Sequence, residues 1–312
     1  MAIAVTNTAA LAISSASSRG FSMTNDGGTV VLAIINQNVI GTPSPTYGGV
    51  SMTLVSTALG RAFLFHLPNA PTGSNSFSYS GTSGSNAGCG YSLSGVKTSS
   101  PIGTTGNDSS GSSISTTLGG ITVGSITIDV AMGANSSTAQ PSPTALGGRT
   151  AGLSLNNGLS VFASSHRITT GTSDTSSWTG TYANLLEQQV VEFKPEPQPP
   201  VITTGAQSEL FSTTTTVSGN EVTDEGDESV TDRGVAYALS TEPTILDSTV
   251  PTGSGLGVFA SDLSGLAGGS TYYARAYATS AIQTSYGSEI SFRTDENAPS
   301  TISILDNPVE FN

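Results

Sequence analysis

Apolar residues recur along this chain in short runs that are separated by glycine, serine, asparagine and proline. No stretch of a dozen residues keeps the spacing of an amphipathic helix without an interrupting glycine, proline or β-branched cluster. Short apolar runs bounded by turn residues are typical of β-sandwiches and barrels. The pattern therefore predicts an all-β protein.

The first part of the chain contains most of the predicted strands. Residues 62–67 are continuously apolar around one histidine, which predicts a central strand buried on both faces. Residues 76–80 alternate instead, so Phe77 and Tyr79 share one face. The clearest predicted strands are 29–36, 51–56, 61–67, 74–80, 90–96, 120–132, 152–155, 160–165 and 186–193.

From residue 200 onward the strands can be separated one by one. Residues 271–278 alternate strictly, so Tyr272 and the alanines share one face while Tyr273 and Tyr277 share the other. Turn signals return about every 8–12 residues, which is the pattern of a β-sandwich. The predicted strands are 210–218, 234–239, 257–263, 271–278 and 286–293.

The charge of the chain changes abruptly at a proline-rich seam, residues 194–200. Residues 1–195 carry six acidic and six basic residues, whereas residues 196–312 carry sixteen acidic residues and three arginines, so the net charge of −13 lies in the second part. Prolines lack amide donors and favour extended geometry, which makes such a run a semi-rigid spacer. The seam therefore predicts two folded units of different surface character.

These boundaries predict a β-sandwich assembly domain over residues 1–194, a linker over 195–200, a second sandwich over 201–295 and a tail over 296–312. The tail contains Ile, Leu, Val and Phe, and chain ends are usually disordered unless they are tied down. We therefore expect the tail to pack on something, such as a neighbouring subunit.

The spacing from Leu266 to Tyr272 matches the tyrosine corner of fibronectin type III modules. With the strings at 231–237 and 272–279, residues 200–295 resemble the type III-like modules repeated in surface proteins of Bacteroidetes and their phages. Gly268 stands where that family often has proline. The resemblance implies an Ig-like sandwich that serves as a spacer or low-affinity binding platform, with structural roles for Leu266 and Tyr272 and no catalysis.

The first domain carries a weaker resemblance. Its turns at 47–49 and 71–73 and its glycine-rich strand at 87–97 resemble a jelly-roll-like domain met in phage structural and tail-associated proteins. The resemblance covers about residues 30–195. It implies an N-terminal jelly-roll-like sandwich that assembles into a virion.

Little in the sequence points to catalysis. Cys89 is the lone cysteine, so an internal disulfide and a cysteine-based zinc site are excluded. His66 lies in an apolar strand and His166 follows one, where we expect a core residue and a solvated turn respectively. The acids of the first domain are widely spaced, and no Gly-x-Ser-x-Gly stands at a strand-to-helix elbow. We therefore expect a protein that is not an enzyme and needs no cofactor.

Two groups of residues are candidates for binding. Oxygen ligands suit calcium, but the acidic run lacks the spacing of an EF-hand loop and equally fits a solvated hairpin tip. Aromatic side chains suit a ligand or a partner when they are exposed and a core when they are buried. The weak metal candidates are Asp224, Glu225, Asp227 and Glu228, and the candidates for ligand or partner contact are Trp178, Tyr273 and Tyr277.

The acidic balance argues against binding to nucleic acid, no apolar run is long enough to span a bilayer, and residues 1–10 lack the features of a signal peptide. We therefore expect a phage virion component (capsid decoration, tail or fibre protein) made in the host cytoplasm and exposed on the particle exterior. Its expected partners are other virion proteins, copies of itself and host-surface glycans. The alternative is a secreted bacterial adhesin or carbohydrate-binding module.

Overall fold

The structure is a computed structural model that describes residues 2–14, 18–36, 41–58, 60–80, 85–109, 114–134, 144–145, 148–156, 160–179 and 184–296. All of the regular elements in these ranges are β-strands, and they pair antiparallel, which confirms the all-β prediction. The chain divides into two compact units, Met1–Glu196 and Pro197–Asn312. The tail beyond residue 296 lies outside the described residues, so its packing stays a prediction.

None of the described residues belongs to a helix that is long and apolar enough to cross a membrane.

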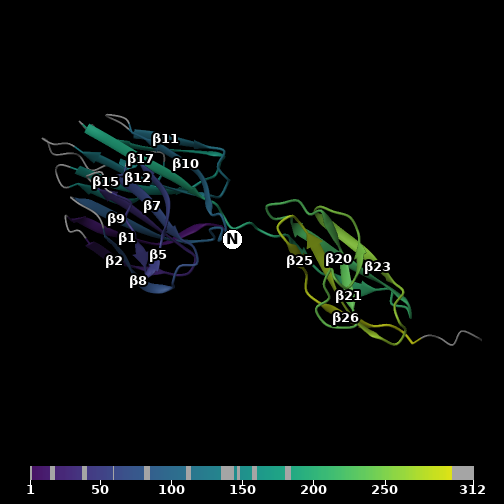
Figure 1. Cartoon of the computed structure of the whole chain (residues 1–312). Coiled ribbons are helices and arrows are strands. Elements are labelled where there is room, and N and C mark those ends of the chain that lie inside the picture. The colour runs from purple at the N-terminus through teal and green to yellow at the C-terminus, as the bar shows by residue number, and fades with distance from the viewer. Residues whose placement is uncertain are drawn as a thin grey trace, which may run out of the picture. The chain divides into compact units, whose positions relative to one another are not determined.

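The first half of unit 1 is a jelly roll (Figure 1). Its strands pair as nested hairpins, because β1 pairs with β9, β2 with β8, β3 with β7 and β4 with β5. This nesting gives one sheet of order β1-β9-β3-β7-β6 and a second of order β2-β8-β4-β5. The strands are β1 Ala4–Ser14, β2 Ser18–Asn25, β3 Thr29–Asn36, β4 Thr46–Tyr47, β5 Val50–Ser51, β6 Thr53–Ala58, β7 Ala62–Leu67, β8 Gly73–Ser80 and β9 Asn86–Ser94.

The second half of unit 1 repeats the same topology. Its large sheet has the order β10-β17-β12-β15-β14 and its small sheet the order β11-β16-β13, which match β1-β9-β3-β7-β6 and β2-β8-β4 strand for strand. Unit 1 is therefore a tandem of two jelly rolls, whereas the sequence predicted one sandwich. The strands are β10 Ile102–Asp108, β11 Ile114–Gly119, β12 Ile126–Ala134, β13 Thr144–Ala145, β14 Thr150–Asn156, β15 Ser160–Ile168, β16 Ser173–Thr179 and β17 Asn184–Phe193.

The two large sheets of unit 1 face each other across the main core. That core joins Val31, Ala33 and Leu64 of the first roll to Ile128 and Val130 of the second, all of them buried. Each large sheet uses its other face to pack against the small sheet of its own roll. The layer order is therefore small sheet, large sheet, large sheet, small sheet. A strand that packs against apolar cores on both faces is apolar at most positions, which is why 30–35 and 62–65 lack alternation.

Unit 2 is a fibronectin type III-like sandwich. One sheet has the order β18-β20-β19 with β23 on β20, and the other has the order β22-β21-β24-β25 with β26 on β24. Alternating inward residues of both sheets form one core. The strands are β18 Val201–Thr203, β19 Ala206–Ser208, β20 Thr214–Asp224, β21 Asp232–Ala238, β22 Ser248–Pro251, β23 Gly257–Ser264, β24 Thr271–Thr279, β25 Thr284–Tyr286 and β26 Ile290–Arg293.

The proline run is attached to folded structure at both of its ends. Pro195 forms an isolated bridge with Val96, and the amide of Glu196 donates to the carbonyl of Gly95 at 2.7 Å. Farther on, the amide of Gln198 donates to Oδ2 of Asp227 at 2.7 Å. Residues at both ends of the predicted linker, 195–200, are therefore hydrogen-bonded to the folded unit next to them.

Candidate functional site

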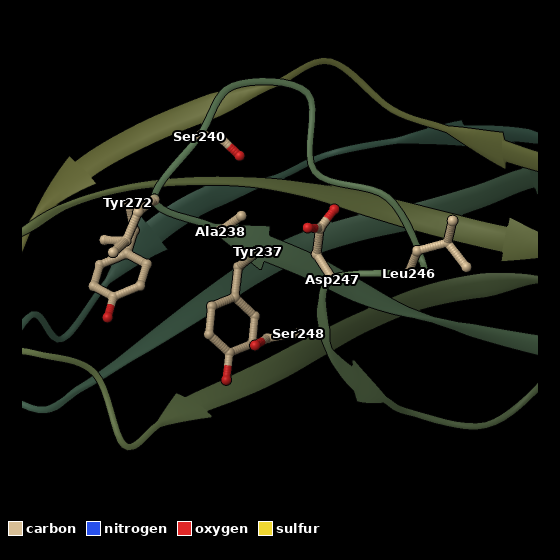
Figure 2. Close-up of a pocket in the computed structure, with 8 residues that line it drawn as sticks. Tyr237, Ala238, Ser240, Leu246, Asp247, Ser248 and Tyr272 are labelled. Atoms are coloured by element: carbon tan, nitrogen blue, oxygen red, sulfur yellow. The ribbon is translucent and has the colours of Figure 1, made fainter.

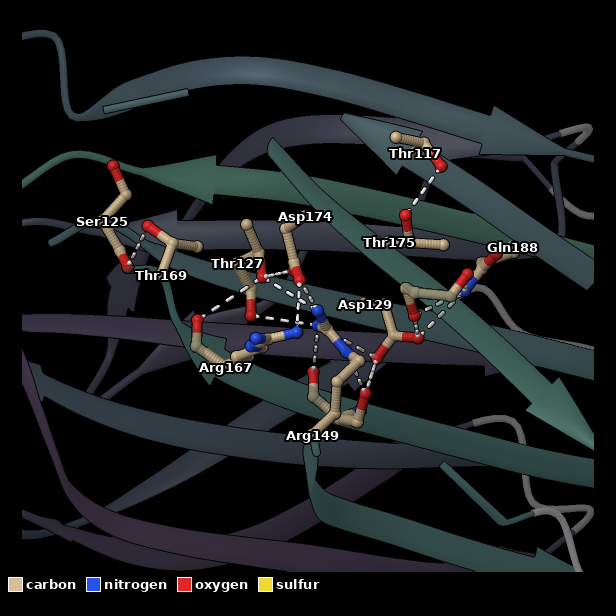
Figure 3. Close-up of polar contacts among 12 residues, drawn as sticks. Thr117, Ser125, Thr127, Asp129, Arg149, Arg167, Thr169, Asp174, Thr175 and Gln188 are labelled. Carbon is tan, nitrogen blue, oxygen red and sulfur yellow. Dashed lines mark hydrogen bonds and ion pairs between the residues drawn. The ribbon is translucent and has the colours of Figure 1, made fainter. Parts of the chain in front are cut away.

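The second jelly roll encloses a network of polar side chains between its two sheets (Figure 3). Its centre is the carboxylate of Asp129 on β12, which is fully buried. Oδ1 of Asp129 accepts a hydrogen bond from the amide of Ser165 at 2.6 Å and another from the Ser165 hydroxyl. Oδ2 accepts from Trp178 Nε1 at 2.6 Å, from Gln188 Nε2 at 3.0 Å and from the Ser176 hydroxyl.

Beside Asp129 lies a buried ion pair. The guanidinium of Arg149 is enclosed together with the carboxylate of Asp174, to which its NH1 donates, and its NH2 lies 3.7 Å from Oδ1 of Asp129. The same guanidinium donates through Nε to the Ser165 hydroxyl at 2.7 Å and through NH2 to the carbonyl of Thr127 at 3.1 Å. The buried charges thus compensate each other, as buried ions must.

This network is a structural polar core rather than an open catalytic site. The Asp129 and Arg149 side chains have no exposed surface, and the groups around them are hydrogen-bonded to one another. A catalytic constellation needs room for a reacting atom within reach of its nucleophile and base. The enclosed side chains of Asp129, Arg149 and Asp174 leave no such room within this network.

Glu192 on β17 is a second carboxylate that the fold uses internally. Its Oε1 accepts from the amide of Thr122 and the hydroxyl of Ser125, both at 2.7 Å, and its Oε2 accepts from the amide of Thr104 at 2.8 Å. Burial alone would raise the pKa of this carboxyl, but the hydrogen bonds from Ser125, Thr122 and Thr104 outweigh it and lower the pKa. Glu192 therefore ties β10 and the start of β12 to β17.

The two histidines lie between the rolls in reciprocal positions. The ring of His66 on β7 packs against that of Phe193 on β17, with their centroids 6.3 Å apart. The ring of His166 on β15 packs against that of Tyr91 on β9, with their centroids 5.6 Å apart. Burial lowers the pKa of both imidazoles, and for His166 the Arg149 charge adds to this effect. The prediction that His166 lies in a solvated turn is wrong, because β15 continues to Ile168 and the side chain is half-buried.

Cys89 also lies in the core between the rolls, fully buried. Burial raises the pKa of its thiol, and the hydrogen bonds with Ser164 and Tyr91 only partly oppose this effect. A buried thiol with a raised pKa is a poor nucleophile. The cysteine and the histidines therefore pack in the core and form no nucleophile–base pair among the described hydrogen bonds.

Trp178 is 3% exposed and hydrogen-bonded to Asp129, so it offers no surface to a ligand. Tyr277 on β24 is 1% exposed and donates to Oδ2 of Asp232 at 3.1 Å. Burial, followed by the Asp232 charge, raises the pKa of Tyr277. Of the three aromatic candidates for ligand contact, the structure leaves only Tyr273 half-exposed. Trp178 takes the core position that was its alternative, and the interpretation of Tyr277 as a surface contact is corrected by its burial.

The acidic run of unit 2 satisfies its own turn. Oδ1 of Asp224 accepts from the amide of Gly226 at 2.9 Å, Oε1 of Glu225 accepts from the amide of Val230 at 2.9 Å, and Asp227 accepts from Gln198. These carboxylates point at separate backbone amides rather than at one centre. With Glu228 included, they belong to no group of three or more metal-binding side chains within the described ranges.

The predicted tyrosine corner is formed by Tyr272 and the residues after Leu266. The Tyr272 hydroxyl accepts a hydrogen bond from the amide of Ala267 at 3.0 Å, while Leu266 is 4% exposed and its amide donates to Thr213. The ring of Tyr272 stacks on Phe292 at 6.0 Å. The corner therefore fixes the connection between β23 and β24 on the core.

Unit 2 contains an open hollow on its surface (Figure 2). It has a volume of about 700 Å³ and lies between β21 and the loop of residues 239–247 that connects β21 to β22. Tyr237 and Tyr272 form its aromatic part, with their rings 6.2 Å apart, and Leu239 and Leu246 form its aliphatic part. Polar groups in its lining come from Ser240, Asp247 and Ser248.

The loop beside the hollow, which we call the aliphatic loop (residues 239–247), exposes three large aliphatic side chains. Leu246 is 93% exposed, Leu239 62% and Ile245 43%. Hydrophobic exposure is normal for single residues, but a cluster on one loop marks an interaction surface.

Two of these features, the polar core around Asp129 and the aliphatic loop, are absent from the predictions made from the sequence. Thr127 and Asp129 alternate with Ile126, Ile128 and Val130, so a polar inward face could have been recognised from period-two spacing. The aliphatic loop carries only an ordinary turn signal around Pro243, and its exposure depends on how the loop is held.

No protein-family description and no curated protein matches this chain. Among solved structures, it aligns with the sensor domain of the anti-sigma factor RsgI4 of Pseudobacteroides cellulosolvens at 16% identity, covering 32% of this chain and 98% of that one, with a TM-score of 0.26. It aligns with a human fibronectin type III domain at 16% identity, covering 35% and 91%, with a TM-score of 0.27. A titin fragment covers 95% of this chain and 100% of its own at 10% identity, with a TM-score of 0.24.

Similarity at these TM-scores carries no argument about function. The fold assignment comes from the chain's own geometry, namely the strand order of unit 2 and the hydrogen bond at its tyrosine corner. On that basis unit 2 is a fibronectin type III-like β-sandwich.

Proposed function

We propose that this chain is a non-enzymatic structural component of a phage virion, a capsid decoration, tail or fibre protein. The tandem jelly rolls serve as the assembly unit, which binds other virion proteins and copies of this chain. The fibronectin type III-like unit is displayed on the particle exterior and serves in surface adhesion.

One observation carries the non-enzymatic part of the proposal. Of the six acidic residues in residues 1–195, four are buried inside the rolls, namely Asp129, Asp174, Glu187 and Glu192. These buried carboxylates are therefore not available as catalytic acids or bases, and the outward faces of the strands carry serine and threonine. A bland, neutral outer surface suits assembly through backbone and apolar contacts repeated over many copies.

The adhesive part of the proposal depends on unit 2. Seven of the eleven exposed large hydrophobic side chains in the described structure lie there, although unit 2 is the shorter unit. Weak contacts of this kind become effective when many copies act together on a particle.

The proposal is tested on particles from the source culture, banded by density and probed with an antibody against unit 2. We expect the full chain to co-sediment with the particles, the antibody to label intact particles, and mild protease to release unit 2 without dissolving them. Full chain that stays in the soluble fraction or sediments only with cell envelopes would contradict a virion role. The envelope result would favour a bacterial adhesin instead.

A further inference from the structure

The aliphatic loop is held in one conformation by a ring of polar contacts. The guanidinium of Arg275 on β24 donates to the carbonyls of Glu242 and Pro243 and lies over the ring of Tyr286, 4.2 Å from its centroid. The Tyr286 hydroxyl in turn accepts from the amide of Ile245 at 3.0 Å. The loop is thus anchored to both β24 and β25.

Two hydrogen bonds close the loop on itself, and a third ties it to Glu289. Oδ2 of Asp247 accepts from the amide of Thr244 at 2.8 Å and from its hydroxyl at 3.2 Å, and the amide of Glu242 donates to the carboxylate of Glu289. Glu242 has a φ of 57°, a left-handed conformation that is costly for a residue with a side chain. Backbone held in such a conformation persists only where its surroundings over-determine it, so the loop is preorganised.

The charge around the aliphatic loop has one sign. Glu242, Asp247 and Glu289 are exposed, whereas Arg275, the cation that contacts the loop, is half-buried and donates to loop carbonyls. Residues 197–296 as a whole carry thirteen acidic residues and three arginines. The loop therefore presents an apolar centre with an acidic rim.

From this arrangement we infer that the aliphatic loop and its hollow form a docking site for a protein partner that presents apolar side chains flanked by Lys or Arg. This inference depends on the proposed adhesive role of unit 2 and names the class of its partner. A rigid apolar centre avoids the entropy cost of ordering on binding, and an acidic rim steers a basic partner.

Two other occupants fit the surface less well. A second copy of the loop would bring its acidic rim against the same acidic rim, which is repulsive. A glycan needs hydrogen-bonding groups and exposed ring faces. The hollow has the rings of Tyr237 and Tyr272, but Tyr272 is only 9% exposed, and the exposed side chains Leu239 and Leu246 provide neither. Aliphatic side chains at the centre of a contact and charges at its rim are the usual composition of a protein interface.

The test uses the immobilised full-length chain and a displayed library of random linear peptides. We expect the selected peptides to combine apolar residues with Lys or Arg. Their affinity should fall by about tenfold or more in Leu246→Ser, since central apolar side chains carry most of the binding energy. The matched control is Val258→Ser, because Val258 is 65% exposed on β23 of the same unit, and we expect less than about a twofold change there.

Several outcomes would overturn the inference. These are peptides that bind Leu246→Ser as well as the unchanged chain, selected peptides without basic residues, a library that yields no binder, or Leu246-dependent retention on a glycan array. If the chain still co-sediments with particles, any of these results would reject the docking site and leave the proposed virion role standing. A chain that fails to co-sediment would remove the proposed virion role independently.

Discussion

The two jelly rolls of unit 1 share one topology and differ in what they enclose. The first roll fills the space between its sheets with apolar and aromatic side chains, among them Leu32, Tyr47 and Phe77. In the second roll, the corresponding space is lined with Asp129, Arg149 and their polar partners, and only small apolar clusters remain. The nested pairing of strands is thus compatible with two opposite kinds of interior.

The difference shows which features specify the roll. Strand order, hairpin nesting and the apolar face between the two large sheets are common to both halves. The inner face toward the small sheet is free to change, provided that each buried polar group finds a partner. An apolar interior tolerates local repacking, whereas a polar interior is stable only when its network is complete.

The largest effect should follow from removing the centre of that network. Asp129→Ala removes the acceptor of Trp178 and of the Ser176 hydroxyl and one of the two carboxylates beside the buried Arg149 charge, which should lower the free energy of unfolding by about 3–5 kcal/mol. Trp178 is the only tryptophan in the chain, so urea unfolding followed by its fluorescence reports directly on this roll.

The control for this change is Asp26→Ala, because Asp26 is an exposed carboxylate of the first roll. It should alter the free energy of unfolding by no more than about 0.5 kcal/mol. If Asp129→Ala were as mild as Asp26→Ala, the network would be dispensable and the contrast between the rolls would carry no energetic meaning.

The sequence predicts much of this fold from its continuous apolar runs and from the alternation of residues. It identifies β3, β7, β8 and most of unit 2, because their apolar patterns are strong. It misses β1, β2, β10 and β11, whose Ser, Thr, Gly and Ala residues have little pattern on half-exposed strands. The duplication was also missed, because it lies in strand order. The polar core leaves a period-two trace at Thr127 and Asp129, whereas no local spacing predicts the docking loop.

A large-to-small substitution in the core of the first roll tests whether the two interiors are energetically coupled. Phe77 is fully buried, with its ring 4.9 Å from that of Phe21 and 4.7 Å from that of Tyr47, so Phe77→Ala should cost about 3–5 kcal/mol. Because the two rolls share the core between their large sheets, Trp178 fluorescence and far-ultraviolet circular dichroism should shift together. An unchanged Trp178 transition would mean that the rolls unfold separately.

A smaller effect, with a defined pH dependence, is expected for Glu192→Gln. The hydrogen bonds that lower the pKa of Glu192 below its ordinary 4.5 stabilise the fold above that pH, and this contribution is lost as the pH falls through the folded-state pKa. The variant should therefore be about 1–3 kcal/mol less stable at pH 7. The difference in free energy of unfolding between the variant and the unchanged chain should vanish in acid. A difference that stayed constant with pH would show that the charge of Glu192 is not involved.

Glu187, on the same strand, should behave in the opposite way. Its carboxylate is fully buried, Oε2 has no hydrogen-bond partner among the described groups, and its ion pair with Arg61 spans 3.5 Å. Burial raises the pKa of Glu187, and the Arg61 charge only partly opposes this. Any stability that this shift confers is present below pH 4.5 and is lost as the pH rises through the folded-state pKa.

Glu187→Gln should consequently stabilise the chain by about 1 kcal/mol at pH 7–8, because it removes a poorly compensated buried charge, and should change little near pH 4. Thermal unfolding of this variant and of Glu192→Gln across the same pH series gives a matched comparison, since both changes are Glu to Gln on β17. Stability lost at pH 8 in Glu187→Gln would show that the Arg61 pair outweighs the burial of the charge. The two glutamates would then differ in degree rather than in sign.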